Sequence, residues 1–436
     1  MKIIVVGGGL AGSEAALQLA KNGFQVDLYE MRPKVSTQAH KTEKLAEFVC
    51  SNSLGSLDIT NASGLLKKEL RMLGSFLINI AMKNSVPAGN ALAIDREGFS
   101  QAVTDLIESN PNINIIREEL TEIPQDAPCI IASGPLTSEK LSQSIKKFTG
   151  EEYLHFFDAI APIVEKDSID FNKAFYASRY DKGEASYINC PMNKEEYEKF
   201  YQILTTAPRI ECKDFEKDAK FFESCLPIEV LASRGVDTLR FGPMKPVGLV
   251  DKRTEIKNYA VVQLRQDDAK ANLYNLVGFQ TNLKWGAQKE LLQSIPGLEN
   301  VSIVRYGVMH QNTFINSPKV LNATFQSRKK PNIFFAGQLT GTEGYTESIA
   351  GGLLAGLNMC RYLNNEKLLE LPQTTMLGAL SSYVSCPEHT AFQPINSNWG
   401  IIAPMEMDRK IKKDKKLKNQ LLANRAIESL LSFLSE

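Results

Sequence analysis

The segment Lys2-Ile-Ile-Val-Val-Gly-Gly-Gly-Leu-Ala-Gly12 decides the fold of this 436-residue chain. Residues 2–6 predict a buried strand, and residues 13–22 carry apolar side chains at helical spacing. Between them lies a glycine turn made of Gly7, Gly8, Gly9, Leu10, Ala11 and Gly12. A second strand over residues 24–29 ends at Glu30. This complete βαβ unit predicts an α/β fold with a Rossmann-like parallel sheet.

The spacing Gly7-x-Gly9-x-x-Gly12 is typical of dinucleotide binding when it opens a helix directly after a strand. The first glycine permits a tight turn, the second lets the backbone approach a pyrophosphate, and the third lets helix and strand pack closely. The helix N-terminus offers N–H donors to the phosphates, and Glu30 can accept hydrogen bonds from an adenosine ribose. The alternative is a structural turn without a ligand.

A strand predicted over residues 332–337 returns to this sheet late in the chain, which favours FAD over NAD. Two-part flavoproteins of this kind place a second helix N-terminus against the flavin, where it stabilises negative charge on the ring. The glycine-rich helical pattern of residues 344–359 is the candidate. We expect contacts to FAD from Gly337, Gly344, Tyr345, Glu347 and Ser348. A close-packed helix pair is the alternative.

Composition indicates a globular protein of two or three domains, with 43% apolar and 23% charged residues. Between residues 171 and 330, short aromatic and β-branched segments alternate with polar turns. We expect a mixed α+β substrate or RNA domain there, inserted into a discontinuous FAD-binding domain of residues 1–170 and 331–436. The 50 basic and 50 acidic residues balance, which excludes nucleic-acid binding through bulk charge but not through a local basic face.

Seven Cys and four His show no paired spacing typical of metal ligands, so we expect no metal site. The odd number of Cys indicates reduced thiols in the cytosol rather than a disulfide framework. No segment approaches the roughly 18 apolar residues that cross a bilayer. We therefore expect a soluble, cytoplasmic protein without a membrane partner, and the sequence leaves its oligomeric state open.

Longer motifs lie at residues 40–44, 47–54, 61–67, 225–230, 237–249, 305–310 and 344–348. They include Glu-Phe-Val-Cys50-Ser-Asn-Ser-Leu54 and Cys225-Leu-Pro-Ile-Glu-Val230. These motifs resemble the folate- and FAD-dependent tRNA (uracil-5-)-methyltransferases of bacteria, and the resemblance runs from residue 1 to about residue 405. One departure is Gly55, where the family usually has an arginine. The change removes a cation close to Cys50.

The resemblance implies transfer of one carbon from 5,10-methylenetetrahydrofolate to C5 of a uracil in RNA, with FAD as carrier and NADH or NADPH as reductant. It implies that Cys225 adds to C6 of the uracil and that Cys50 is the acid/base at C5. Covalent addition at C6 divides one difficult step into two easier ones. Periodicity alone does not single out these two thiols, since any one Cys is more often a buried apolar side chain.

An RNA substrate predicts a basic surface around the flavin, because the target base has to leave the folded RNA. Candidates near the chemistry are Arg240, Lys245 and Arg305. Further candidates are Arg409, Lys410, Lys412 and Lys413, which lie in a basic helical segment. The alternative is that this segment is only a solvent-exposed helix face. We expect tRNA rather than ribosomal RNA as the substrate. Rival functions are the same chemistry on ribosomal RNA, a flavin oxidoreductase without RNA, and a non-catalytic FAD-binding RNA chaperone.

Overall fold

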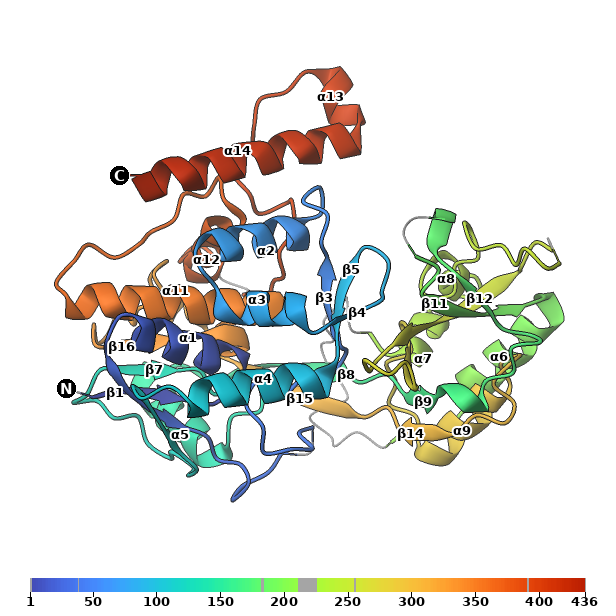
Figure 1. Cartoon of the computed structure of the whole chain (residues 1–436), viewed down its shortest axis with the longest axis horizontal. Helices are drawn as coiled ribbons and strands as arrows, with labels where there is room; N and C mark the ends of the chain where they lie inside the picture. Colours follow the sequence, from blue (N-terminus) through green and yellow to red (C-terminus); the bar gives the residue numbers. More distant parts are fainter. Residues whose placement is uncertain are drawn as a thin grey trace.

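The computed structural model describes residues 2–37, 39–181, 184–210, 226–254, 256–389 and 392–435, and for residues 154–158, 310 and 311 the backbone alone. Figure 1 shows a larger body that carries both ends of the chain and a smaller body beside it. Strands β8 (Leu154–Ala159) and β15 (Met309–Phe314) pair antiparallel between the two, and they carry the chain into and out of the smaller body.

A five-stranded parallel sheet of order β16-β7-β1-β2-β6 lies at the centre of the larger body. Its strands are β1 (Lys2–Val6), β2 (Gln25–Tyr29), β6 (Ile113–Ile116), β7 (Cys129–Ile131) and β16 (Ile333–Phe335). Strands β7 and β16 are buried at every position, as in sheets covered by helices on both faces. The predicted α/β fold is confirmed, and the late strand returns to the first sheet as predicted.

Helices α1 (Leu10–Lys21) and α11 (Tyr345–Leu363) pack together on one side of this sheet, and α5 (Glu139–Thr149) lies on the other (Figure 1). Their close approach depends on glycines of α11. A Cβ atom on Gly352 would lie 2.1 Å from the carbonyl oxygen of Ala11, and one on Gly356 would lie 3.1 Å from Cα of Ala15. Gly352 and Gly356 therefore allow the close-packed helix pair that was the alternative interpretation of this glycine-rich pattern.

The remaining elements of the larger body surround this central unit. A small sheet contains β3 (Ser53–Ser56), β4 (Ser85–Val86) and β5 (Ala91–Ile94). The helices are α2 (Ala62–Met72), α3 (Phe76–Lys83), α4 (Arg96–Glu108), α10 (Ser317–Val320), α12 (Met376–Ser385), α13 (Arg409–Lys413) and α14 (Lys415–Ser435). The basic segment near the C-terminus thus forms two helices rather than one, because the carboxylate of Asp414 accepts hydrogen bonds from the first N–H groups of α14.

The smaller body contains a six-stranded sheet of order β10-β11-β12-β13-β9-β14, flanked by helices. Its strands are β9 (Ile163–Glu165), β10 (Phe175–Ala177), β11 (Tyr187–Met192), β12 (Ala260–Gln266), β13 (Leu273–Leu276) and β14 (Ile303–Arg305). Its helices are α6 (Lys194–Thr206), α7 (Ile228–Ser233), α8 (Thr238–Phe241) and α9 (Trp285–Gln293). One core cluster runs from Val164 to Val301. The inserted domain of residues 171–330 stays a prediction, and this core favours edges nearer to β8 and β15.

The described residues contain neither a candidate membrane span nor a candidate metal centre. No helix among them is long and apolar enough to span a membrane. No group of three or more His, Cys, Asp or Glu side chains among them is placed to hold a metal ion.

Candidate functional site

A cavity of about 1000 Å³ lies at the carboxyl ends of β1 and β2, where open α/β sheets bind their ligands. Segments far apart in the sequence form its wall. Residues predicted to bind FAD that line it are Gly7, Gly9, Leu10, Ala11, Glu30, Gly337, Tyr345 and Ser348. The cavity thus brings the glycine turn together with the segment that follows β16, from Gly337 to Ser348.

The glycine turn fits a pyrophosphate group. Gly7 has φ +102°, and a Cβ on it would lie 2.5 Å from the carbonyl oxygen of Ala132. A Cβ on Gly12 would lie 1.8 Å from the carbonyl oxygen of Gly7, whereas one on Gly9 would meet nothing within 4 Å. The protein's own backbone therefore requires Gly7 and Gly12. Gly9 instead borders open space at the N-terminus of α1, where helix N–H groups can donate hydrogen bonds to a phosphate.

The carboxylate of Glu30 is bound to the glycine turn and to Arg32. It accepts hydrogen bonds from the N–H of Gly8 (3.1 Å) and from Nε and Nη2 of Arg32 (2.9 and 3.1 Å). Burial opposes ionisation, but the hydrogen bonds and charge of Arg32 hold the pKa of Glu30 below its usual range. Glu30 is therefore an acceptor-only carboxylate beside the cavity, as ribose binding needs. Its contact with ribose stays a prediction.

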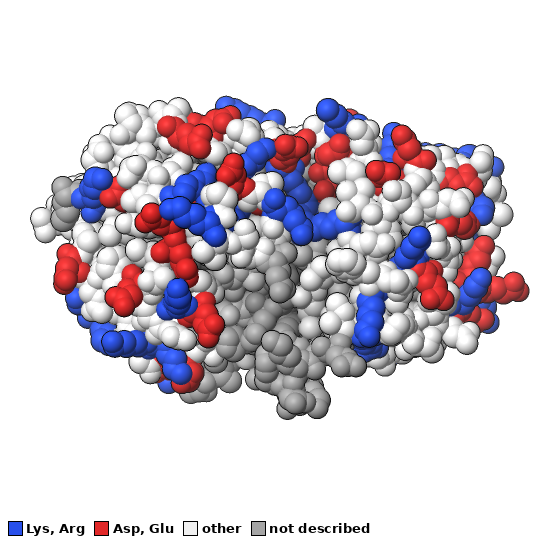
Figure 2. Space-filling view, turned by 90° about the horizontal axis from the view of Figure 1, so that it is seen from below, with Lys and Arg blue, Asp and Glu red and all other residues white. Residues whose placement is uncertain are grey.

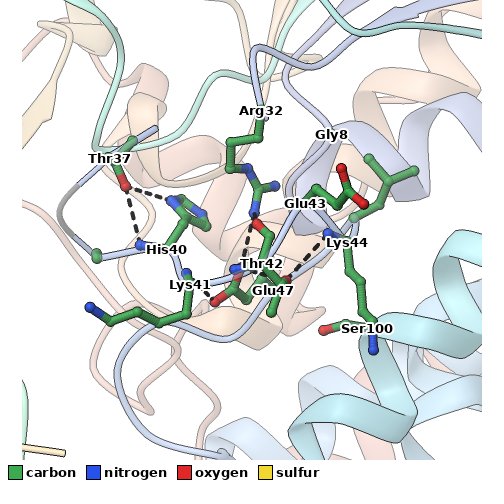
Figure 3. Close-up of polar contacts among 12 residues, drawn as sticks. Gly8, Arg32, Thr37, His40, Lys41, Thr42, Glu43, Lys44, Glu47 and Ser100 are labelled. Atoms are coloured by element: carbon green, nitrogen blue, oxygen red, sulfur yellow. Dashed lines mark hydrogen bonds and ion pairs between the residues drawn. The ribbon is translucent and has the colours of Figure 1, made fainter. Parts of the chain in front are cut away.

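Arg32 also organises the loop formed by Thr37 and residues 39–47 beside the cavity (Figure 3). Its Nη1 donates to Oε2 of Glu47 and to the carbonyl of Thr42, both at 3.0 Å. Glu47 further accepts hydrogen bonds from the N–H groups of Lys41 (2.8 Å) and Thr42 (3.0 Å). In the same loop, the Thr37 hydroxyl and the His40 ring are 2.7 Å apart. The sequence predicted no role for Arg32 or Glu47; the signals were that Arg32 follows the strand that ends at Glu30 and that Glu47 begins the motif of residues 47–54.

Cys50 is half-buried and held from several sides. Its N–H donates to the hydroxyl of Tyr345 (2.6 Å), and its carbonyl accepts a hydrogen bond from Nη2 of Arg96 (2.8 Å). Its Sγ lies 3.8 Å from the carbonyl oxygen of Ala159. Because Tyr345 also lines the cavity, one hydrogen bond separates the backbone of Cys50 from the proposed flavin site.

Two arginines of the smaller body reach the loop that carries Cys50. Nη2 of Arg305 donates to the carbonyl of Val49 (2.7 Å), and Nε of Arg265 donates to Oδ1 of Asn52 (3.1 Å). Burial lowers the pKa of both guanidinium groups, and both interact electrostatically with the Cys50 thiol. Nearby positive charge is what a thiolate requires. Arg305 thus supports the Cys50 loop, and its predicted contact with RNA stays a prediction.

A second cavity, of about 910 Å³, lies at the N-terminus of α11, and Gly344, Tyr345 and Glu347 line it. Gly344 has φ +117°, a conformation that favours glycine, and Glu347 accepts hydrogen bonds from the N–H and Oγ of Ser397 at 2.9 and 2.6 Å. The predicted cofactor residues from Gly337 onward are therefore divided between two cavities, with Tyr345 in the wall of both, whereas Gly8 and Gly12 line neither.

Lys67 lies behind this second cavity and is 2% exposed. Its Nζ donates to the carbonyl of Leu54 at 2.7 Å, and a Cβ on Gly55 would lie 3.9 Å from that nitrogen. Burial lowers the pKa of Lys67 to about 8, although the negative charge of Glu347 acts to raise it. One ammonium group therefore lies beside Gly55, and the departure from the resemblance at this position stays a prediction.

Cys225 lies outside the described residues, which resume at Leu226. Just after it, the N–H of Ile228 donates to the carbonyl of Gln280 (2.7 Å), and Glu229 accepts a hydrogen bond from the hydroxyl of Thr281 (2.9 Å). Thr281 in turn packs against the backbone of Gly307, where a Cβ would lie 2.6 Å from its Cγ2. The chain after Cys225 is thus fixed close to the segment that carries Arg305.

The other basic candidates occupy separate places. Nε of Arg240 donates to the carbonyl of Tyr259 (3.0 Å), and its guanidinium lies 3.5 Å from the centre of that ring. Lys245 is half-buried in the smaller body. Arg409, Lys410, Lys412 and Lys413 lie in α13, at the upper edge of the larger body in Figure 1. Figure 2 shows Lys and Arg side chains near the middle of another face. RNA contact by these candidates stays a prediction.

The fold and the glycine-lined cavity define a protein of the two-part, Rossmann-like, dinucleotide-binding class. The family model Glucose inhibited division protein A (GIDA) matches residues 2–367. Two crystal forms of Aquifex aeolicus GidA superpose with a TM-score of 0.69 at 16% and 17% identity, over 100% and 99% of this chain and 75% and 76% of theirs. The chain therefore belongs to the GIDA family and shares the fold of these structures.

Within that class, several relatives of high identity bear one name, methylenetetrahydrofolate--tRNA-(uracil-5-)-methyltransferase TrmFO. The proteins of Bacillus velezensis and Anoxybacillus flavithermus are 58% and 56% identical, over 98% and 100% of this chain and 97% and 100% of theirs. The Brevibacillus brevis protein is 57% identical over 100% of this chain and 98% of its own length. The chain belongs to the TrmFO family, which confirms the resemblance predicted from the sequence.

Proposed function

We propose that this protein is a methylenetetrahydrofolate- and FAD-dependent tRNA (uracil-5-)-methyltransferase that makes 5-methyluridine. The observation that carries this proposal is the 56–58% identity with TrmFO proteins over almost the whole chain. The cavity supports it, because the glycine turn, Glu30 and Tyr345 surround one space in a fold that binds dinucleotides. The alternative of ribosomal RNA as substrate is an outcome of the experiment below.

Each cofactor-binding residue has a proposed task. The N–H groups of Gly9, Leu10 and Ala11 at the start of α1 hold the pyrophosphate of FAD, and Glu30 binds the ribose. Arg32 keeps Glu30 ionised, and its ion pair with Glu47 keeps the adjoining loop in place. Gly337, Gly344, Tyr345, Glu347 and Ser348 flank the flavin. When bound, FAD supplies the carrier of the one-carbon unit and of the reducing electrons.

The two thiols act on the uracil. The Cys225 sulfur adds to C6, which makes C5 nucleophilic, and is released when the C6–S bond breaks again. Cys50 takes the C5 proton after the new carbon–carbon bond has formed. The charges of Arg265 and Arg305 support this role of Cys50. We further propose NADH or NADPH as the reductant, the T-loop uridine as the target, and the cytoplasm as the location.

The test is transfer of label from 5,10-[¹⁴C-methylene]tetrahydrofolate into an unmodified tRNA transcript, with NADH or NADPH present. The expected result is labelled 5-methyluridine in the tRNA, dependent on both the folate and the nicotinamide. Label in a ribosomal RNA transcript but not in tRNA would move the substrate to ribosomal RNA. Oxidation of NAD(P)H without label in either RNA would leave a flavin oxidoreductase and overturn the proposal.

A further inference from the structure

An aromatic pair lies in the wall between the two bodies, apart from the cavities described above. The indole of Trp285, the first residue of α9, stacks on the ring of Tyr306 with 5.4 Å between centroids and 17° between planes. Trp285 is nevertheless 61% exposed, although a tryptophan normally buries most of its large apolar surface. Tyr306 covers only part of the indole, so the ring has surface left for another planar group.

A hollow of about 660 Å³ adjoins this pair, and both bodies form its wall. Ala39 and Lys41 come from the loop of the larger body, whereas Arg305 comes from β14 of the smaller one. Lys41 is exposed, as is Lys284, which directly precedes Trp285. The stacked rings are therefore accompanied by two exposed ammonium groups and one guanidinium group. This combination of aromatic surface and positive charge is what binds single-stranded nucleic acid.

The hollow is also connected to the chemistry. Arg305, in its wall, donates the hydrogen bond to Val49 that supports the Cys50 loop. When the target uridine leaves the base stack of the RNA to reach Cys50, the neighbouring bases are exposed as well. A base next to the target uridine then needs a stacking partner close to the target position. Trp285 offers one, because it lines the same hollow as Arg305.

We propose that Trp285, backed by Tyr306, stacks on an unpaired base of the RNA next to the target uridine, with Lys41 and Lys284 facing its phosphates. This proposal rests on the proposed function in one respect, that RNA is the substrate. The tail of the folate is the competing occupant. The exposure of Trp285 favours RNA, because small-molecule sites enclose most of their ligand, whereas a base on a polymer leaves one side in water.

The first test uses the indole itself. The chain has two tryptophans, Trp285 and Trp399, so the Trp399→Phe variant reports on Trp285 alone. Titration of this FAD-loaded variant with an unmodified tRNA transcript should quench the fluorescence, with a midpoint equal to the Kd from filter binding. Unchanged fluorescence at saturating RNA would overturn the proposal. This readout needs no catalysis, so it stays valid if the proposed function fails in the labelling assay.

The second test is substitution. Trp285→Ala should raise the Kd for the tRNA transcript about tenfold, and Trp285→Phe should recover most of that loss. FAD content and the KM for methylenetetrahydrofolate should remain as in the parent. Leu431→Ala, at a site on α14 that is 54% exposed, is the control and should not change the Kd. An unchanged Kd for Trp285→Ala, or a raised KM for the folate alone, would contradict the proposal.

Discussion

Arg305 and Val49 lie 256 residues apart in the sequence, yet Nη2 of Arg305 donates a 2.7 Å hydrogen bond to the Val49 carbonyl. The bond joins the smaller body to the residue that precedes Cys50. Arg96 holds the other side of Cys50 through its carbonyl at 2.8 Å, and Arg96 is itself paired with Asp267 of the smaller body at 3.0 Å. The position of the Cys50 thiol therefore depends on how the two bodies are joined.

Arg305→Met should slow methyl transfer about tenfold or more while FAD remains bound. Methionine retains much of the apolar volume but removes the charge and a charge-assisted hydrogen bond, which typically contributes about 1.5–3 kcal/mol. Single-turnover kinetics of label transfer measure the effect, and absorbance of bound flavin checks the cofactor. Arg305→Lys, which retains the charge, should transfer the methyl group at a rate between those of the parent and Arg305→Met. A parent-like rate in Arg305→Met would show that the arginine does not position Cys50.

Gly9→Ala and Gly12→Ala should fail for different reasons. A methyl group on Gly9 meets no protein atom within 4 Å, so the FAD-free variant should unfold at the temperature of the FAD-free parent while its FAD affinity falls. Gly9→Val should be colourless. A methyl group on Gly12 would lie 1.8 Å from the Gly7 carbonyl oxygen, so this variant should lose stability itself. Calorimetry and flavin absorbance separate the cases, and a yellow Gly9→Val protein would contradict the pyrophosphate assignment.

Lys67 should make stability depend on pH in the alkaline range. Its pKa falls from 10.5 to about 8 on folding, because burial disfavours the charged ammonium group. Between these values the unfolded chain binds more protons, so the free energy of unfolding should rise with pH by about 3 kcal/mol relative to a chain without this group. Lys67→Met supplies that comparison. The free energy of unfolding of Lys67→Met minus that of the parent should decrease from pH 8 to pH 10.5. A difference that is independent of pH would contradict the shifted pKa.

The sequence predicted the parts of the site that depend on local structure. Gly7, Gly12 and Glu30 lie within one βαβ unit, where spacing alone determines their arrangement, and the strand before Gly337 was visible as an apolar run. Arg32 and Glu47 could not be predicted, because their contact depends on the path of an irregular loop. Arg305 was assigned to RNA from its charge. Its contact with Val49 arises only when two bodies, separated by a long insertion, are assembled.

The need for both thiols in methyl transfer is the central claim, and FAD-loaded Cys225→Ala and Cys50→Ser variants test it most directly. The measurement is label transfer from methylenetetrahydrofolate to the tRNA transcript, at flavin content equal to that of the parent. The account predicts no labelled 5-methyluridine from Cys225→Ala, and none from Cys50→Ser, although both proteins are yellow and are reduced by NADH or NADPH. Turnover by Cys225→Ala at the parent rate would contradict it.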